Sequence, residues 1–264
     1  MDRRELLDRA ARDEDERLLL GRVWDKWEQC RLRSIPTATD FLSPQEQAAA
    51  QRLLGALGVH DGYVFFGGYD GAERAVRLFL PDWMDPSDAG TYSPIRCLRA
   101  AFRKEENLTH RDFLGSLMGL GLTRGTIGDI LVTEDRCQVL TLPKTAEFLL
   151  SAWESAGRVR LKTAPLPPEE LEIPAQACRE LRDTVSSLRL DNVLAAGFSL
   201  SRGRAAEAVE KGAVQVNWTV CQKPDKPVAA GDTITCRGLG KCVLDSVGGP
   251  TKKGRLPVVI RRFV

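Results

Sequence analysis

The chain has 264 residues, of which 43% are hydrophobic and 28% charged, and its formal net charge is +2. These values are ordinary for a globular protein with two or three compact domains. No run approaches the roughly 18 apolar residues of a membrane span, and the charged N-terminus lacks the apolar core of a signal peptide. We therefore expect a cytoplasmic protein with no membrane partner.

The reactive side chains argue against metal or redox chemistry. The seven cysteines are scattered, odd in number and form no C-x-x-C pair, a pattern that favours reduced, buried thiols over disulfides or structural zinc. The two histidines, His60 and His110, are expected in a loop and at a helix start, with no nucleophile at a recognisable spacing. We expect no metal, no cofactor and no catalytic residue.

The first predicted module, residues 1–80, has α/β character. Residues 1 to about 30 are expected to be helical, with Trp24 and Trp27 in the core. After a break, Ser43, Pro44 and Glu46 form a complete helix start, with a capping box and proline at the first helical position. This helix is expected to end by residue 58, and two strands follow at 62–67 and 74–80.

The second predicted module, residues 81–164, has the order strand, helix, strand, strand, helix, strand. This is the split-βαβ arrangement of ferredoxin-like folds and RNA-recognition modules (RRMs), but the order alone does not indicate RNA binding. The strands are expected at 95–102, 129–132, 137–141 and 158–162, and the helices between 109 and 121 and around Phe148, Leu149 and Trp153.

Two readings of the segment from Gly125 to Gly128 remain open. It matches the G-x-x-G loop with which KH domains clamp nucleotides. Alternatively, the two glycines turn the chain into the next strand. We prefer the turn, because a strand and not a helix is predicted after Gly128.

A connector, residues 165–176, separates the second module from the third. Residues 164–176 hold four prolines and three acidic residues, a composition typical of a stiff, extended segment.

The third predicted module, residues 177–264, begins with two short helices. The first carries Leu190, Val193 and Leu194 on one face and is expected to end at Gly197 in a left-handed C-cap. Ser201 is expected to cap the second helix, residue 212 to end it, and residues 213–216 to form a strand.

Positive charge is concentrated in this last third. Residues 181–264 contain 14 lysines and arginines against 7 acidic residues, hence +7, whereas the rest of the chain carries −5. Arg202 and Arg204 lie in the first turn of the second helix, where cations are unfavourable unless an anion binds. We therefore predict a phosphate-binding surface; the alternative is that these are ordinary solvated charges. The predicted RNA-binding residues are Arg189, Ser201, Arg202, Arg204, Lys211, Asn217, Lys223, Arg237 and Lys241.

The same stretch resembles the RNA-binding domain named after the fourth protein of the small ribosomal subunit, here called the S-four domain. The matching positions are Arg189-Leu-Asp191, Ser201-Arg202, Gly212, Val214-x-Val216-Asn217, Gly231-Asp232-x-Ile234 and Arg237-Gly238-x-Gly240. The S-four pattern usually has glycine after the asparagine, where this chain has Trp218. That departure, and the tail from Thr251 to Arg255, resemble the YlmH-like proteins of bacteria.

The YlmH-like resemblance extends over nearly the whole chain. It includes the Phe-Leu-x-Pro-x-Glu motif that ends at Glu46 and the stretch from Thr109 to Ile130. It implies an α+β protein with an N-terminal module, an RRM-like module and an S-four domain. It also implies association with the large ribosomal subunit, rescue of stalled nascent chains still attached to tRNA, and a cell-division gene neighbourhood.

Two functions follow. The first is a non-enzymatic RNA-binding protein with rRNA and tRNA on the large subunit as partners, together with nascent-chain quality-control factors. The second is an RNA-modifying enzyme of the pseudouridine synthase or rRNA methyltransferase type, because S-four domains are often attached to such enzymes. The sequence has no Gly-rich cofactor loop after a strand and no synthase-type Gly-Arg-Leu-Asp segment, so we favour the first.

Overall fold

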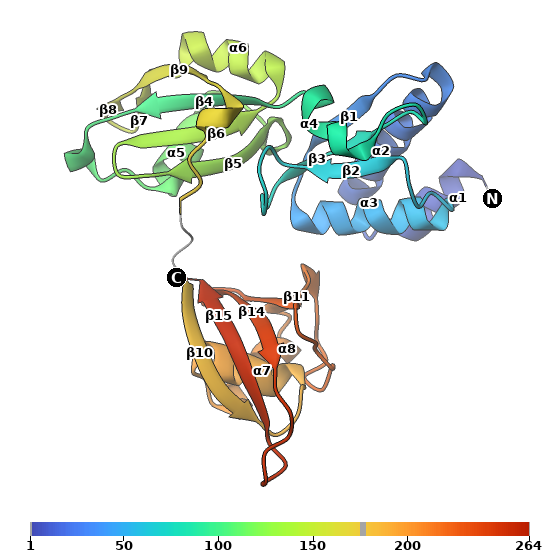
Figure 1. Ribbon diagram of the computed structural model, residues 1–264, viewed down its shortest axis with the longest axis vertical. Helices are drawn as coiled ribbons and strands as arrows, with labels where there is room; N and C mark the ends of the chain where they lie inside the picture. The colour runs from blue at the N-terminus through green and yellow to red at the C-terminus, as the bar shows by residue number, and fades with distance from the viewer. Residues whose placement is uncertain (1, 175–177, 264) are drawn as a thin grey trace. The chain divides into compact units, whose positions relative to one another are not determined.

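The computed structural model describes residues 2–174 and 178–263 (Figure 1). The chain divides into two compact units, Met1–Pro174 and Ala175–Val264. Both mix helices and strands, which confirms the predicted α+β class. No helix of the described residues is long and apolar enough to cross a membrane.

The first unit begins with three helices packed against one face of a three-stranded antiparallel sheet. Leu20, Leu53 and Phe79 lie at the centre of this core, and Trp24 and Trp27 pack against it as predicted. The helix start at Ser43 is also confirmed: the Ser43 amide donates to Glu46 and the Glu46 amide to the Ser43 hydroxyl. The elements are α1 (Arg3–Ala10), α2 (Glu14–Arg33), β1 (Thr37–Leu42), α3 (Pro44–Ala56), β2 (Tyr63–Phe66) and β3 (Ala75–Phe79), with strand order β1-β3-β2.

Strand β1 was not predicted, because the sequence favours a break between two helices there. The strand is short and irregular, with a register shift between Ala38 and Phe41. Its partner β3 follows only after α3 and β2, so its pairing is not visible in the local pattern. The break indicated by the sequence is therefore an edge strand.

The second half of this unit has the predicted split-βαβ topology. Its antiparallel sheet has the order β5-β6-β4-β9, and α5 and α6 pack on one face through Phe113, Leu149 and Trp153. The main elements are β4 (Arg96–Ala101), α5 (His110–Gly119), β5 (Ile127–Val132), β6 (Arg136–Thr141), α6 (Pro143–Ala152) and β9 (Lys162–Leu166). A four-residue helix, α4 (Ala89–Tyr92), precedes them, and four 3-10 turns lie at residues 86–88, 104–106, 124–126 and 168–170.

The last strand lies later than predicted. Residues 155–156 and 159–160 form a small hairpin of their own, β7 (Ser155–Ala156) and β8 (Val159–Arg160), because Gly157 takes the left-handed conformation that this tight turn needs. The strand that completes the four-stranded sheet is β9, which pairs with β4.

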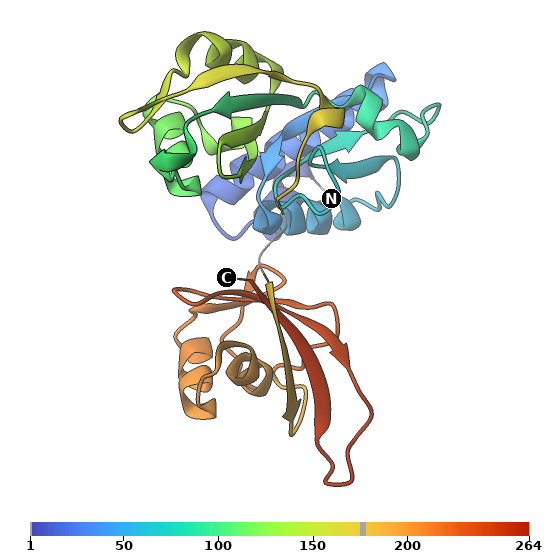
Figure 2. The same ribbon diagram turned by 60° about the vertical axis from the view of Figure 1, so that its left-hand side comes forward.

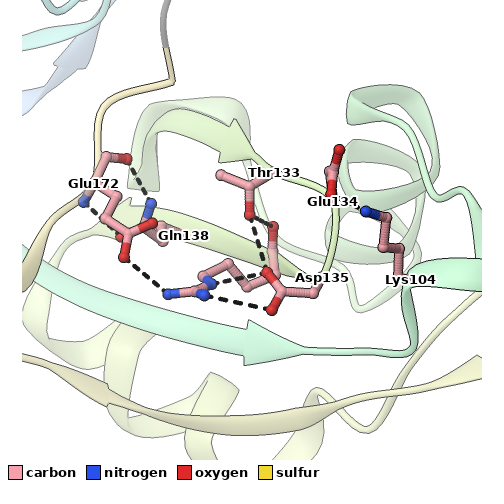
Figure 3. Close-up of polar contacts among 7 residues, drawn as sticks. Lys104, Thr133, Glu134, Asp135, Gln138 and Glu172 are labelled. Carbon is pink, nitrogen blue, oxygen red and sulfur yellow. Dashed lines mark hydrogen bonds and ion pairs between the residues drawn. The ribbon is translucent and has the colours of Figure 1, made fainter.

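The chain after β9 is held against the sheet up to residue 172, inside the segment predicted to be a connector. The side-chain NH2 of Gln138 donates to the Glu172 carbonyl at 2.6 Å, and its side-chain oxygen accepts the Glu172 backbone N–H at 2.9 Å (Figure 3). Arg136 pairs with the Glu172 carboxylate at 2.9 Å. Leu166 is buried as well. The proline-rich segment is therefore extended, as its composition predicts, but up to residue 172 it packs against the four-stranded sheet.

The second unit is a six-stranded antiparallel sheet with two helices on one face (Figure 2). Its core is formed by residues such as Leu194, Val209, Leu244 and Ile260. The elements are β10 (Cys178–Val185), α7 (Leu190–Phe198), α8 (Arg202–Glu210), β11 (Val214–Val216), β12 (Thr219–Val220), β13 (Thr233–Cys236), β14 (Gly240–Val247) and β15 (Leu256–Phe263), in the order β10-β15-β14-β13-β11-β12.

The role predicted for Gly197 was wrong. The helix continues to Phe198, and the left-handed C-cap is Ser199, with φ of 54°. A β-carbon on Gly197 would lie 3.0 Å from the Cys242 sulfur and 3.4 Å from a methyl group of Ile260. Glycine is needed here because the helix lies directly on the sheet, and not because the helix ends.

The cysteines are unpaired, and six of the seven are buried. Burial raises the pKa of Cys30, Cys97 and Cys137, and raises that of Cys242 to about 12. Only Cys178, at the start of β10, is exposed.

Candidate nucleic-acid interface

The candidate interface is built around one buried carboxylate at the start of α7. Asp191 is only 3% exposed. Arg189 donates to both of its oxygens at 3.1 Å, and the Nε of Arg202 donates to Oδ2 at 3.2 Å. The arginines themselves reach solvent, with 40% and 58% of their side chains exposed. Asp191 therefore fixes two guanidinium groups side by side at the surface.

The electrostatics of this cluster agree with its geometry. Burial alone would raise the pKa of Asp191, but hydrogen bonds and charges from Arg189 and Arg202 outweigh it, and the pKa lies below its ordinary value. The carboxylate is thus ionised at neutral pH and orients both arginines. Each arginine has five donors in a planar fork, so it still has donors for a phosphate.

A loop closes the cluster on one side. The amides of Leu190 and Asp191 donate to the carbonyls of Lys226 and Pro224, at 2.8 and 2.9 Å. The first turn of α7 is therefore satisfied by protein, and an anion would contact side chains there. The same loop carries the exposed Lys223, so this predicted residue lies close to the cluster.

The start of α8 adds the next positive charge. The Ser201 hydroxyl accepts the Arg204 amide at 3.3 Å, which confirms Ser201 as the N-cap of the helix. Arg204 is exposed. Of the predicted site residues, the structure thus brings the side chains of Arg189 and Arg202 together on Asp191. Ser201 and Arg204 lie in the same helix start as Arg202, and Lys223 lies in the adjoining loop.

The other predicted residues lie elsewhere in the domain. Lys211 pairs with Glu207 at 2.5 Å at the far end of α8. Arg237 is exposed in the turn between β13 and β14. Lys241 lies over the ring of Phe263, 4.7 Å from its centroid. Because its neighbour Cys242 points into the core, alternation places Lys241 on the sheet face opposite the helices.

Asn217 has a structural role in the β11–β12 turn. Its side chain donates to Asp232 at 2.7 Å and accepts the Thr233 amide at 3.0 Å. Both turn residues are left-handed, Asn217 at φ 48° and Trp218 at φ 59°, as a two-residue hairpin turn requires. This explains why the S-four pattern prefers glycine at the position of Trp218. An RNA contact by Asn217 stays a prediction.

The RRM-like module does not present the usual RRM platform. RRMs stack bases on aromatic residues of the sheet face that lies opposite their helices. Here that face carries Cys97, Gln138 and Leu140, and the first module covers it through Phe41 and Val76. This face of the module therefore serves the core of the unit and not base stacking.

The segment 125–128 also packs inside this unit. A β-carbon on Gly128 would lie 2.6 Å from the Phe41 ring, and the next residue, Asp129, accepts hydrogen bonds from Tyr69 and from the amides of Glu73 and Arg74. This supports the preferred reading of the glycines as a turn and not as a KH loop.

Sequence reasoning identified the arginines but not the residue that positions them. Asp191 was noted only as part of the S-four pattern. Its signal was an acidic residue in the first turn of a largely apolar helix, two residues after an arginine. The link to Arg202 depends on how α7 and α8 pack, which the local pattern does not contain.

Comparison with known proteins agrees with this architecture. Residues 188–234 match the family described as "S4 domain", and residues 101–170 match "Putative RNA-binding domain in YlmH". A curated relative, "Ribosome-associated protein quality control protein P2" of Bacillus subtilis (strain 168), is 37% identical over 224 residues, which cover 85% of this chain and 86% of the relative. The chain belongs to the YlmH family. A solved structure, "Cell division protein ylmH from Streptococcus pneumoniae", shares the fold with a TM-score of 0.50 at 18% identity, covering 61% of this chain and 98% of that one.

Proposed function

We propose that this YlmH-family member is a non-enzymatic protein that binds rRNA and tRNA on the large ribosomal subunit, in the cytoplasm, during rescue of stalled nascent chains. The observation that carries the RNA part is the pair of exposed arginines fixed by the buried Asp191. The exposed Arg204 in the same helix start as Arg202, and the exposed Lys223 in the adjoining loop, add positive charge. Such fixed guanidinium groups suit phosphates of structured RNA, which are read by shape more than by sequence. The ribosomal part rests on the relative's name.

The RNA surface is tested by the double variant Arg202→Gln, Arg204→Gln. Glutamine at 202 avoids placing a second negative charge against Asp191. We expect binding of bulk tRNA and of purified large subunits to fall about 30-fold or more at physiological salt. The slope of log affinity against log salt should fall by about 2, because two phosphate contacts are lost.

The matched control is Arg179→Gln, Arg182→Gln, which removes the same charge from exposed positions on β10. It should lower affinity less than about threefold, since general attraction contributes only weakly without direct contacts. Equal losses in the two double variants, or wild-type affinity in the first, would refute the interface.

The ribosomal role is tested by sedimentation of cell extract with and without stalled translation. The protein should travel with large subunits that carry peptidyl-tRNA and should leave that fraction in the Arg202, Arg204 variant. Recovery only in ribosome-free fractions would reject the role in rescue and leave a general RNA-binding protein.

The alternative, an RNA-modifying enzyme with an S-four targeting domain, makes a different prediction. Purified rRNA and tRNA incubated with the protein would gain modified nucleosides detectable by mass spectrometry. We expect no such gain at enzyme-to-RNA ratios that saturate binding.

A further inference from the structure

A second basic site lies next to the interface, in a cavity of about 350 Å³ that opens between the helices and the end of the sheet. Its walls come from the end of β10, from α7, from the start of α8 and from the loop before β15. Arg202 lines one side of this cavity and Arg255 lines another; the remaining lining residues are Asp183, Thr184, Val185, Ser186, Asn192, Ala195, Ala196 and Leu200.

Arg255 is held in place much as Arg202 is. Its Nε donates to the Thr184 hydroxyl at 2.9 Å, and its Nη2 donates to the Thr184 carbonyl. Its own backbone is fixed by a closed turn, in which the Arg255 amide donates to the Thr251 hydroxyl at 3.1 Å and the Thr251 amide donates to the Arg255 carbonyl at 2.8 Å. Among its hydrogen bonds to described residues, none uses Nη1, so one edge of the guanidinium is left for a ligand.

The charge around the cavity favours an anion. Lys252 and Lys253 occupy the exposed tip of the same turn, next to Arg255. Asp183 is the one acidic residue among those that line the cavity, and its carboxylate accepts a hydrogen bond from the Thr184 amide at 2.6 Å. Asn192 and Ser186 add polar groups, and the side-chain NH2 of Asn192 donates to the Ser186 hydroxyl at 3.1 Å.

We propose that this cavity binds a phosphodiester of the same RNA that contacts Arg202 and Arg204, so that Arg202 is shared by two adjacent phosphate sites. The inference rests on the proposed RNA-binding function. A phosphodiester is favoured over a protein carboxylate because the cavity is continuous, through Arg202, with the predicted phosphate surface. Two arginines, each anchored on one edge, also suit the several oxygens of a phosphate.

The test is Arg255→Gln, with bulk tRNA and purified large subunits as the probes. We expect affinity to fall about fivefold to tenfold and the salt slope to fall by about 1, as for the loss of one phosphate contact. Arg255→Lys keeps the charge but loses the planar fork, so it should bind about twofold to fourfold more weakly with the salt slope nearly unchanged. A thermal melt of each variant checks that it is folded.

The charge-matched control is Arg179→Gln, at the other end of β10 and about 16 Å along the strand from Thr184. It should change affinity less than twofold. Wild-type binding by Arg255→Gln, or an equal loss in Arg179→Gln, would overturn the second site alone if the Arg202, Arg204 variant still loses binding. If that double variant also binds like wild type, the proposed function itself fails.

Discussion

Each of the two units contains a carboxylate close to two arginines, but only the carboxylate of the second unit accepts hydrogen bonds from the arginine side chains. In the first unit, Asp129 accepts the Tyr69 hydroxyl at 2.8 Å and the Arg74 amide at 3.0 Å. The Arg74 guanidinium then donates to main-chain carbonyls, those of Phe41, Arg124 and Ile127, at 3.0 to 3.1 Å. In the second unit, Asp191 takes the side chains of two arginines, which remain substantially exposed.

The hydrogen-bond partners of an arginine cluster distinguish a cluster that binds a ligand from one that stabilises the fold. Burial lowers the pKa of Arg74, and burial together with the charge of Arg74 lowers that of Arg124. The hydrogen bond to Asp191 raises the pKa of Arg189 instead. Arginines whose N–H groups donate to main-chain carbonyls connect elements of the fold. Arginines that are oriented by a buried carboxylate at the surface still have N–H groups available for a ligand.

The largest effect is expected from a variant that breaks the arginine cluster of the first unit. Arg74→Ala removes three hydrogen bonds to carbonyls between β1, β3 and the turn before β5. We expect the free energy of unfolding to fall by about 3 kcal/mol, because partly buried acceptors lose a charged donor. Urea unfolding of the full chain measures this. The exposed Arg111→Ala is the control and should stay within about 0.5 kcal/mol; RNA affinity of folded Arg74→Ala should equal wild type.

A somewhat smaller effect is expected at the glycines beside Asp129. A new β-carbon in Gly128→Ala would meet the Phe41 ring at 2.6 and 2.8 Å, whereas in Gly125→Ala it would meet Asp40 at an ordinary 3.5 Å. In urea unfolding, the free energy of unfolding should fall by about 2 kcal/mol in Gly128→Ala, because the new methyl group overpacks the core. It should change by less than about 0.5 kcal/mol in Gly125→Ala. A loss of RNA affinity in folded Gly125→Ala would instead revive the KH reading.

Asp191→Asn sharpens the comparison at the second cluster. Losing the charge should cost about 1 kcal/mol and weaken RNA binding about tenfold, because Arg189 and Arg202 lose their orientation. The pKa of Asp191 in the folded protein lies below its ordinary value. The free energy of unfolding should therefore differ fully between wild type and Asp191→Asn at pH values above the ordinary Asp pKa of about 3.9. This difference should vanish as the pH falls through the lower pKa of the folded state. Denaturant unfolding from pH 6 to pH 3 tests this; a constant difference would contradict the ionised carboxylate.

The smallest effect is expected at the end of α8. Lys211→Gln breaks an exposed i,i+4 ion pair with Glu207, so stability should change by about 0.3 kcal/mol. Its effect on RNA affinity should be below that of Arg204→Gln alone. A larger loss at Lys211 would place the centre of the interface at the far end of the helix.

The sequence was most informative where structure depends on neighbouring residues. The capping box of Ser43 and Glu46, the cap at Ser201 and the sequence of helices and strands along most of the RRM-like module are all readable from local patterns. It was least informative where a residue acts across the fold. Gly197 was misread because its contact Cys242 lies on β14, far along the chain, and the hydrogen bonds of Asp129 to the Glu73 and Arg74 amides join segments more than fifty residues apart.

The burial of the cysteines has a practical consequence for measurement. Maleimide reagents attack the thiolate of an accessible cysteine, and six of the seven thiols are enclosed by the fold. A dye added to the native protein at neutral pH should therefore attach at Cys178 and leave the interior unmarked. That position begins the first strand of the second unit, so the unaltered sequence already carries a single spectroscopic label site at the start of its S4-domain unit.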